Sequence, residues 1–167
     1  MAETKAMQVL KNGILLEKKG QAFYSKVSSD TNSNVLKDFF DTMAKQEAMH
    51  LKFLSEQYSI YQETKCFGKI QYPVNEESFA VSDVITKEVI EAIGAASFEA
   101  AAISAAMIME DNAIKMYATR AAEAEDSEEK ALYTWLSEWE KGHLAFLSEL
   151  DRMITEEIWF DNNFWPF

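Results

Sequence analysis

Residues 47–56 read EAMHLKFLSE, and residues 140–149 read EKGHLAFLSE. Each copy contains one of the only two histidines of the chain, His50 and His143, three residues after a glutamate. Residues three apart on a helix lie on the same face, so each histidine lies one turn beyond its glutamate. The repeated Glu-x-x-His pattern therefore predicts two helices that present matching polar groups.

The repeat extends beyond these two segments at the same offset of 93 residues. Thr4 is matched by Ser97, Glu17 by Glu110 and Tyr24 by Tyr117. The repeats therefore span residues 4–56 and 97–149. Four carboxylates and two imidazoles in one repeated pattern suit a pair of metal ions. The candidate metal ligands are Glu17, Glu47, His50, Glu110, Glu140 and His143.

The composition is that of a single helical domain over residues 1–167, with 48% hydrophobic residues and only two prolines and five glycines. A net charge of −12 argues against a nucleic-acid partner and against an anionic membrane, since both favour a basic face. The lone Cys66 excludes an internal disulfide and a four-cysteine iron site. No signal peptide and no run of about 18 apolar residues is found, so we expect a cytoplasmic protein.

Turn and capping residues divide the chain into helices. The cluster SSDTNSN at 28–34 ends the first, and Asp126 or Ser127 caps the last, with Glu129 in position to complete a capping box. A short helix over 83–93 is also expected. The long helices are predicted over 4–27, 34–61, 97–123 and from 126 or 127 to 156.

Each repeat is then a helix hairpin, and residues 57–96 form a crossover between them. A helix of 25 residues is about 37 Å long, which this crossover can span, so the two hairpins can pack about a pseudo-twofold axis. Residues equidistant from a hairpin turn lie at one level, so Glu17 faces Glu47 and Glu110 faces Glu140. The sequence therefore predicts an all-α four-helix bundle with all four glutamates near one height.

The glutamates interrupt apolar stripes that should face the core. A buried, unpaired carboxylate costs several kcal/mol, and no lysine or arginine lies on the stripes at this level. Two divalent cations would neutralise four carboxylates. Carboxylates with a few imidazoles suit iron or manganese.

The pattern Glu17…Tyr24…Glu47-x-x-His50, repeated at Glu110 and beyond, resembles the di-iron carboxylate domain of the ferritin-like superfamily, and the rubrerythrin family most closely. The resemblance implies a ferritin-like four-helix bundle that holds two iron ions. Glu17 and Glu110 would be terminal or bridging carboxylates, Glu47 and Glu140 the other carboxylate ligands, and His50 and His143 would each complete one iron.

Two departures from rubrerythrins bear on function. In rubrerythrins, the ligand that corresponds to Glu110 is usually followed three residues later by another glutamate. Here that position is Ala113. A rubredoxin domain with four cysteines is also missing. The resemblance still implies an oxidoreductase that reduces hydrogen peroxide or dioxygen, with electrons from a separate donor protein such as a rubredoxin.

Three alternatives stay open: a ferritin-like ferroxidase that handles iron in a multi-subunit shell, an oxygenase with an apolar substrate cavity, and a structural protein with a vestigial site. Tyr24 and Tyr117 either hydrogen-bond ligand carboxylates or simply fill the core. The aromatic tail, residues 157–167, folds back over the bundle or packs on a second subunit, and we favour a homodimer.

Overall fold

A computed structural model of the chain describes residues 4–73, 93 and 98–161, with side chains up to residue 156. Nearly all of these residues belong to four long helices: α1 (Lys5–Asp30), α2 (Asn34–Thr64), α5 (Phe98–Glu123) and α6 (Ser127–Asp161). The predicted short helix over 83–93 falls almost entirely outside the described residues. None of the described helices combines the length and the hydropathy needed to cross a membrane.

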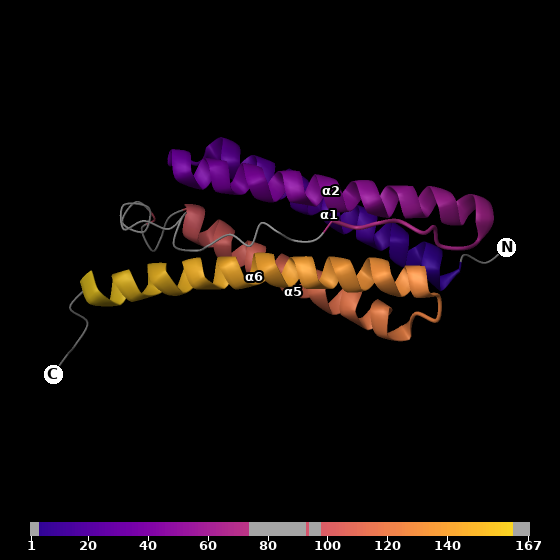
Figure 1. Cartoon of the computed structure of the whole chain (residues 1–167). Coiled ribbons are helices and arrows are strands. Elements are labelled where there is room, and N and C mark those ends of the chain that lie inside the picture. The colour runs from indigo at the N-terminus through magenta and orange to yellow at the C-terminus, as the bar shows by residue number, and fades with distance from the viewer. Residues whose placement is uncertain (1–3, 74–92, 94–97, 162–167) are drawn as a thin grey trace.

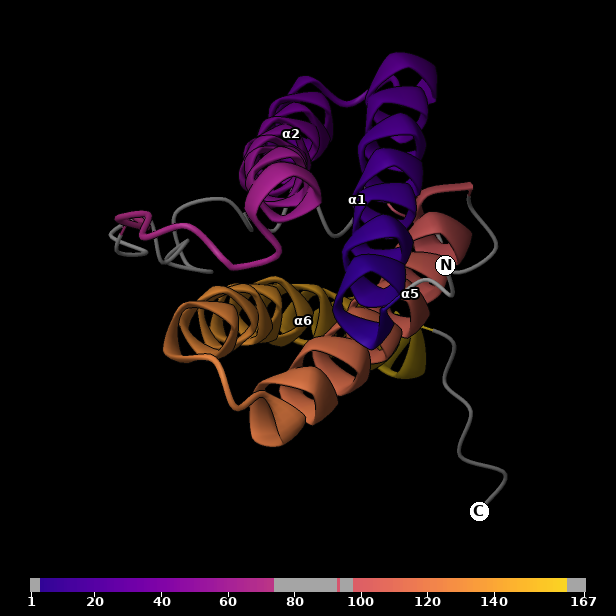
Figure 2. The same cartoon turned by 90° about the vertical axis from the view of Figure 1, so that its right-hand side faces the viewer.

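The helices pair as two antiparallel hairpins, α1 with α2 and α5 with α6 (Figure 1). Seen from the end, α1 lies over α5 and α2 lies over α6, so the hairpins stack into a four-helix bundle (Figure 2). The colours of Figure 1 show that α2 and α5 run in the same direction. The predicted all-α bundle of two hairpins with a long crossover is therefore confirmed.

Side-chain caps begin three of the helices. Thr4 Oγ1 accepts a hydrogen bond from the backbone N–H of Met7, and Ser33 Oγ accepts one from Leu36. Asp126 Oδ1 accepts from the N–H groups of Glu128 and Glu129, at 2.8 and 3.1 Å. The expected capping box is not closed by Glu129, because its carboxylate binds the guanidinium of Arg120 through two hydrogen bonds of 2.7 Å.

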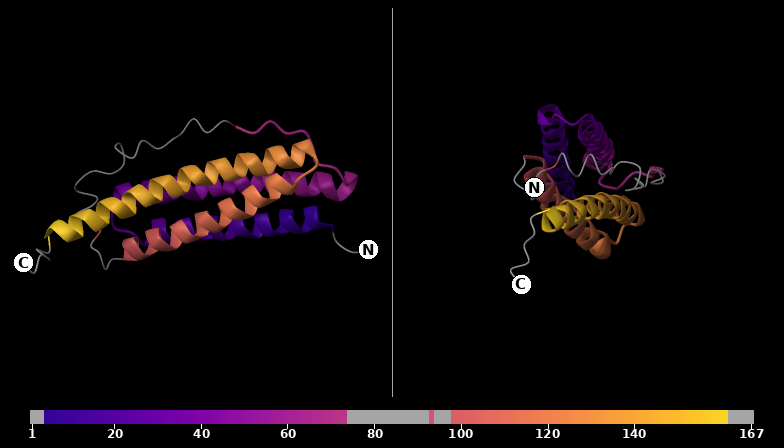
Figure 3. Two further views of the ribbon diagram at one scale, coloured as in Figure 1. Left: turned by 90° about the horizontal axis from the view of Figure 1, so that it is seen from below. Right: turned by 90° about the vertical axis from the view of Figure 1, so that its left-hand side faces the viewer.

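Three helices are longer than predicted at their C-terminal ends. α1 continues to Asp30 because Ser29 donates back to the carbonyl of Lys26 and Lys26 pairs with Asp30. α2 continues to Thr64, and the C-cap residue Lys65 has a left-handed φ of 62°. α6 continues to Asp161 and projects beyond its neighbours (Figure 3), since neither glycine nor proline interrupts 157–161. The predicted tail thus begins as helix, and residues 162–167 lie outside the described residues.

Two apolar clusters fill the bundle, one on each side of a polar layer. One cluster lies toward the α1–α2 turn and includes Tyr24, Phe40 and Ile103, all fully buried. The other lies toward the α5–α6 turn and includes Leu10 and Tyr117. The six predicted metal ligands lie between the two clusters, so water reaches them from neither end of the core.

Candidate metal centre

Every helix contributes to the polar layer. Glu17 comes from α1, Glu47 and His50 from α2, Glu110 from α5, and Glu140 and His143 from α6. None of these six residues is more than 4% exposed. The structure therefore brings together all six residues that the repeat predicts. The four glutamates occupy the inward faces of their helices at equal distances from the hairpin turns, and each histidine lies one helical turn beyond its glutamate.

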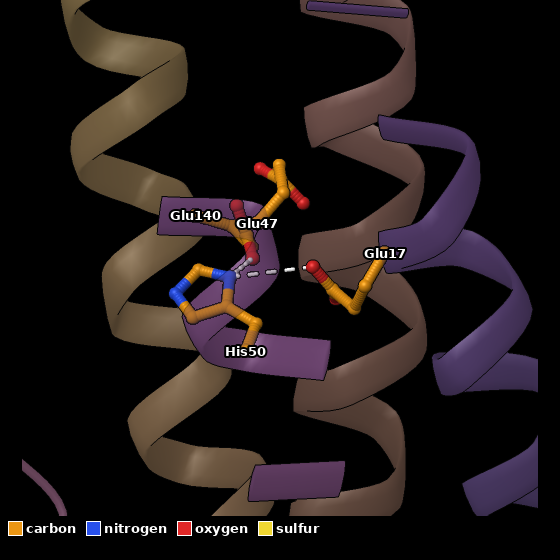
Figure 4. Close-up of side chains that lie close together, drawn as sticks. All are labelled: Glu17, Glu47, His50 and Glu140. Carbon is orange, nitrogen blue, oxygen red and sulfur yellow. Dashed lines mark hydrogen bonds and ion pairs between the residues drawn. The ribbon is translucent and has the colours of Figure 1, made fainter. Parts of the chain in front are cut away.

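The six residues form two overlapping groups of possible metal ligands. One group is Glu17, Glu47, His50 and Glu140 (Figure 4), and the other is Glu47, Glu110, Glu140 and His143. Within each group, one donor atom per residue lies within 4.8 Å of every other. Glu47 and Glu140 belong to both groups, so any two ions held here would be neighbours.

Both histidines direct Nδ1 toward the carboxylates. His50 Nδ1 lies 2.9 Å from Glu140 Oε1 and 3.3 Å from Glu17 Oε2. His143 Nδ1 lies 2.9 Å from Glu140 Oε2 and 3.5 Å from Glu47 Oε1. The two imidazole rings are 5.9 Å apart between centroids, on the two sides of Glu140.

The two tyrosines hydrogen-bond glutamates of the opposite hairpin. Tyr24 on α1 donates to Glu110 Oε1 on α5, and Tyr117 on α5 donates to Glu17 Oε1 on α1. Both rings are also fully buried within the apolar clusters. Of the two alternatives left open by the sequence, the tyrosines hydrogen-bond the glutamates and do not simply fill the core. The exchange across the hairpins follows the pseudo-twofold axis.

Sequence reasoning missed Gln46, whose Oε1 lies 2.6 Å from Nε2 of His143. Because the amide oxygen can only accept, this nitrogen carries a proton. In the neutral imidazole, the form that binds a metal, Nδ1 therefore has its lone pair toward the carboxylates. The one available signal was a polar residue directly before Glu47. The repeat does not predict a role for Gln46, since the matching position in the second half is Trp139.

The surroundings of His50 were also missed. Trp135 and Trp139 meet its ring edge-on, with centroids 5.3 and 5.5 Å away. Among the described residues, His50 Nε2 has no hydrogen-bond partner, although it is buried. The two histidines thus both direct Nδ1 to Glu140 and differ on their outer sides.

Charge in the layer is balanced by protons when no metal is present. Burial and the charge of Glu140 raise the pKa of Glu47 well above its usual range and raise the pKa of Glu110 to about 7. Burial opposes ionisation of the histidines, but the charge of Glu140 outweighs it and raises the pKa of His50 to about 10 and of His143 to about 9. Burial likewise opposes ionisation of Glu140, yet the two imidazolium groups hold its pKa well below the usual range.

Among the described residues, several buried polar atoms of the layer make no hydrogen bond beyond the ion pairs between histidines and carboxylates. They are both carboxylate oxygens of Glu140, Oε1 of Glu47, Nε2 of His50 and Nδ1 of His143. A buried polar atom that has no partner at all costs roughly 1–3 kcal/mol. Four of the five are carboxylate oxygens or an Nδ1 directed into the centre of the layer, where a cation would satisfy them. Carboxylates and imidazoles are ligands that iron and manganese accept, so the residues present fit a pair of such ions.

Comparisons with known proteins agree with this fold and site. The family model described as Rubrerythrin matches residues 8–151. A solved structure described as a hypothetical protein, Pfu-1136390-001, from Pyrococcus furiosus has a TM-score of 0.65 and 23% sequence identity, covering 93% of this chain and 94% of that chain. At this identity the likeness supports the fold alone. No curated protein matches the chain.

Proposed function

Since the chain belongs to the rubrerythrin family, we propose that it is an oxidoreductase that reduces hydrogen peroxide or dioxygen at a pair of iron ions. One observation carries this proposal: the two groups of buried donor atoms share Glu47 and Glu140. Two ions held by groups that share two carboxylates would lie close enough to engage both oxygen atoms of one small molecule.

The residues divide naturally between the two ions. Glu17 and His50 would hold one ion, Glu110 and His143 the other, with the shared Glu47 and Glu140 between them. When bound, iron supplies one electron per ion for breaking an O–O bond, and manganese would suit the same donors. Reduction of one hydrogen peroxide to two waters takes two electrons and two protons.

The tyrosines orient the carboxylates. Burial and the nearby glutamates raise the pKa of Tyr24 and of Tyr117 well above the usual range, so both hydroxyls stay protonated and act as donors. Each hydroxyl holds one oxygen of its glutamate, Oε1 of Glu110 or of Glu17, and leaves Oε2 for an ion. The apolar clusters on either side exclude bulk water from these hydrogen bonds.

The cysteine content bears on the source of the electrons. Cys66 is the only cysteine, which is too few for a four-cysteine iron site in this chain. We therefore propose a separate electron-donor protein, such as a rubredoxin, as the partner that reduces the ions after each reaction.

Metal analysis followed by rapid mixing tests the proposal. We expect about two irons per chain, and rapid oxidation of the reduced protein by hydrogen peroxide or dioxygen in stopped-flow absorption. Glu47→Gln and Glu140→Gln should both lower the iron content, whereas the exposed Glu56→Gln on α2 should not. A protein that holds two irons and reacts with neither oxidant would refute the oxidoreductase proposal. Many irons per chain inside a large shell would instead support the ferroxidase.

A further inference from the structure

A small cavity borders the buried glutamates and is lined by residues of α1 and α5. These two helices lie one over the other in Figure 2. The cavity leaves about 10 Å³ for the centre of a water-sized molecule. That space holds roughly one water molecule. The four glutamates of the candidate metal centre line its inner end, and the remaining wall is formed by Leu16, Gly20, Met109 and Ala113.

These four wall residues are two pairs related by the 93-residue repeat. Leu16 and Met109 directly precede Glu17 and Glu110 in the sequence, and both are partly exposed. Gly20 and Ala113 follow the same glutamates by one helical turn and are buried. The cavity therefore has two long apolar side chains at its outer end and two of the smallest residues beside the carboxylates.

The small residues are the reason that space remains next to the glutamates. A Cβ atom on Gly20 would lie 2.9 Å from Oε2 of Glu47, so even one methyl group would displace this carboxylate or its own helix. Ala113 is 4% exposed, and its methyl group is all that occupies the matching position on α5. In both directions along the bundle the layer is closed by the apolar clusters that contain Tyr24 and Tyr117.

We propose that this cavity is the access route of the substrate, and that Leu16 and Met109 restrict it to molecules of two or three non-hydrogen atoms. Hydrogen peroxide and dioxygen would pass, and organic hydroperoxides would be excluded. The inference rests on the proposed function and narrows the substrate class of the same site. Its physical basis is that a space for one water molecule accepts the end of an O–O group, whereas an alkyl substituent would have to displace both apolar side chains.

Two peroxides that differ by one tert-butyl group test the restriction. With iron-loaded, reduced protein, hydrogen peroxide should react at least about 100-fold faster than tert-butyl hydroperoxide, since a single methylene can be worth about 10–200-fold in a tight pocket. Leu16→Ala and Met109→Ala should each shrink this ratio by about tenfold. The matched controls are Leu15→Ala and Ile108→Ala, which shorten neighbouring side chains that are 55% and 65% exposed and do not line the cavity.

Ligand binding without turnover gives an independent readout. Formate and benzoate present the same carboxylate to the oxidised iron-loaded protein, and absorption titration should give binding of formate at least about 100-fold tighter, with the difference reduced in the two cavity variants. All four substituted residues are at least partly exposed, and a thermal melt followed by circular dichroism verifies that each variant is folded.

Three results would overturn the size restriction while leaving the proposed function in place. These are a wild-type ratio near one for the two peroxides, equal binding of formate and benzoate, or cavity variants that change no more than their controls. Absence of bound iron, or loaded protein inert to both hydrogen peroxide and dioxygen, would instead overturn the proposed function itself.

Discussion

Substitution of Gln46 by leucine should lower the affinity for one of two metal ions and leave the affinity for the other unchanged. Gln46 Oε1 lies 2.6 Å from Nε2 of His143, in a position where 6% of the glutamine is exposed. Leucine has a similar volume and cannot accept this hydrogen bond, so the imidazole loses the partner that fixes its tautomer. Loss of such a partner typically weakens metal binding by about 10–100-fold. This corresponds to about 1.4–2.7 kcal/mol.

The effect should be confined to one ion because the two histidines differ on their outer sides. Among the described residues, Nε2 of His50 makes no hydrogen bond, so the ion on that side depends on no equivalent of Gln46. Titration of metal-free protein with Fe(II) against a competing chelator, without oxygen, should therefore resolve two affinities in the wild type, with the ion beside His143 bound more tightly. The variant should show one affinity unchanged and one weakened.

A second buried glutamine on α2 provides the control. Gln57 is fully buried and bonds Gly68 and Tyr72, away from the metal ligands. Gln57→Leu should lower thermal stability and leave both metal affinities within about threefold of the wild type. Equal weakening of both ions by Gln46→Leu, or a change no larger than that of the control, would refute the reasoning.

Three further predictions concern protons, the tyrosines and the glycine beside Glu47. In metal-free protein, the pKa of Glu110 is raised to about 7 and that of His50 to about 10. The stability that their bound protons contribute is therefore complete below the pKa that each group has in the unfolded chain. It is lost as pH rises through the pKa of the folded protein. The urea midpoint should therefore fall steadily between pH 5 and pH 8, and a midpoint that rises over this range would contradict the assignment. Tyr117→Phe should lower the free energy of unfolding in urea by about 1–3 kcal/mol, because Glu17 loses a buried hydrogen-bond donor. The control Tyr133→Phe should change it by less than about 0.5 kcal/mol, since that buried hydroxyl has no partner among the described residues. Equal effects of the two substitutions would exclude a specific role for the Tyr117 hydroxyl. Gly20→Ala should weaken binding of both ions, because the added methyl group displaces the shared Glu47. Gly68→Ala, whose added methyl group meets only the side chain of Ile60, should lower stability and leave metal binding normal in the same chelator titration. Unchanged metal affinity in the Gly20 variant would show that Glu47 has room to move.

The repeat made the four helices and the meeting of the six residues predictable. Glu17 and Glu47 are equidistant from one turn, and Glu110 and Glu140 from the other, so helix geometry alone places each pair at one level. The partners of Tyr24 and Tyr117 were not predictable in the same way. They lie on the opposite hairpin, and their distances depend on how the hairpins pack rather than on spacing along one helix.

Other differences between expectation and structure have local causes. The capping box at Glu129 failed because Arg120, on the preceding helix, offers its carboxylate a bidentate partner. Gln46 was missed because a repeat identifies only what both halves share, and this residue is where they differ. The cavity beside Gly20 and Ala113 was equally invisible, since no expectation about empty space follows from residue type alone.

Joining both hairpins in one chain has a consequence for how the two ions can differ. Two identical hairpins associating as separate molecules would build the same ring of glutamates, histidines and tyrosines, but every position would then occur twice with the same side chain. Covalent fusion removes that constraint. The chain has glutamine at 46 and tryptophan at the matching position 139, and glycine at 20 and alanine at 113. Divergence of the duplicated halves thus allows one ion to be tuned without the other, which no symmetric pair of half-length chains can achieve.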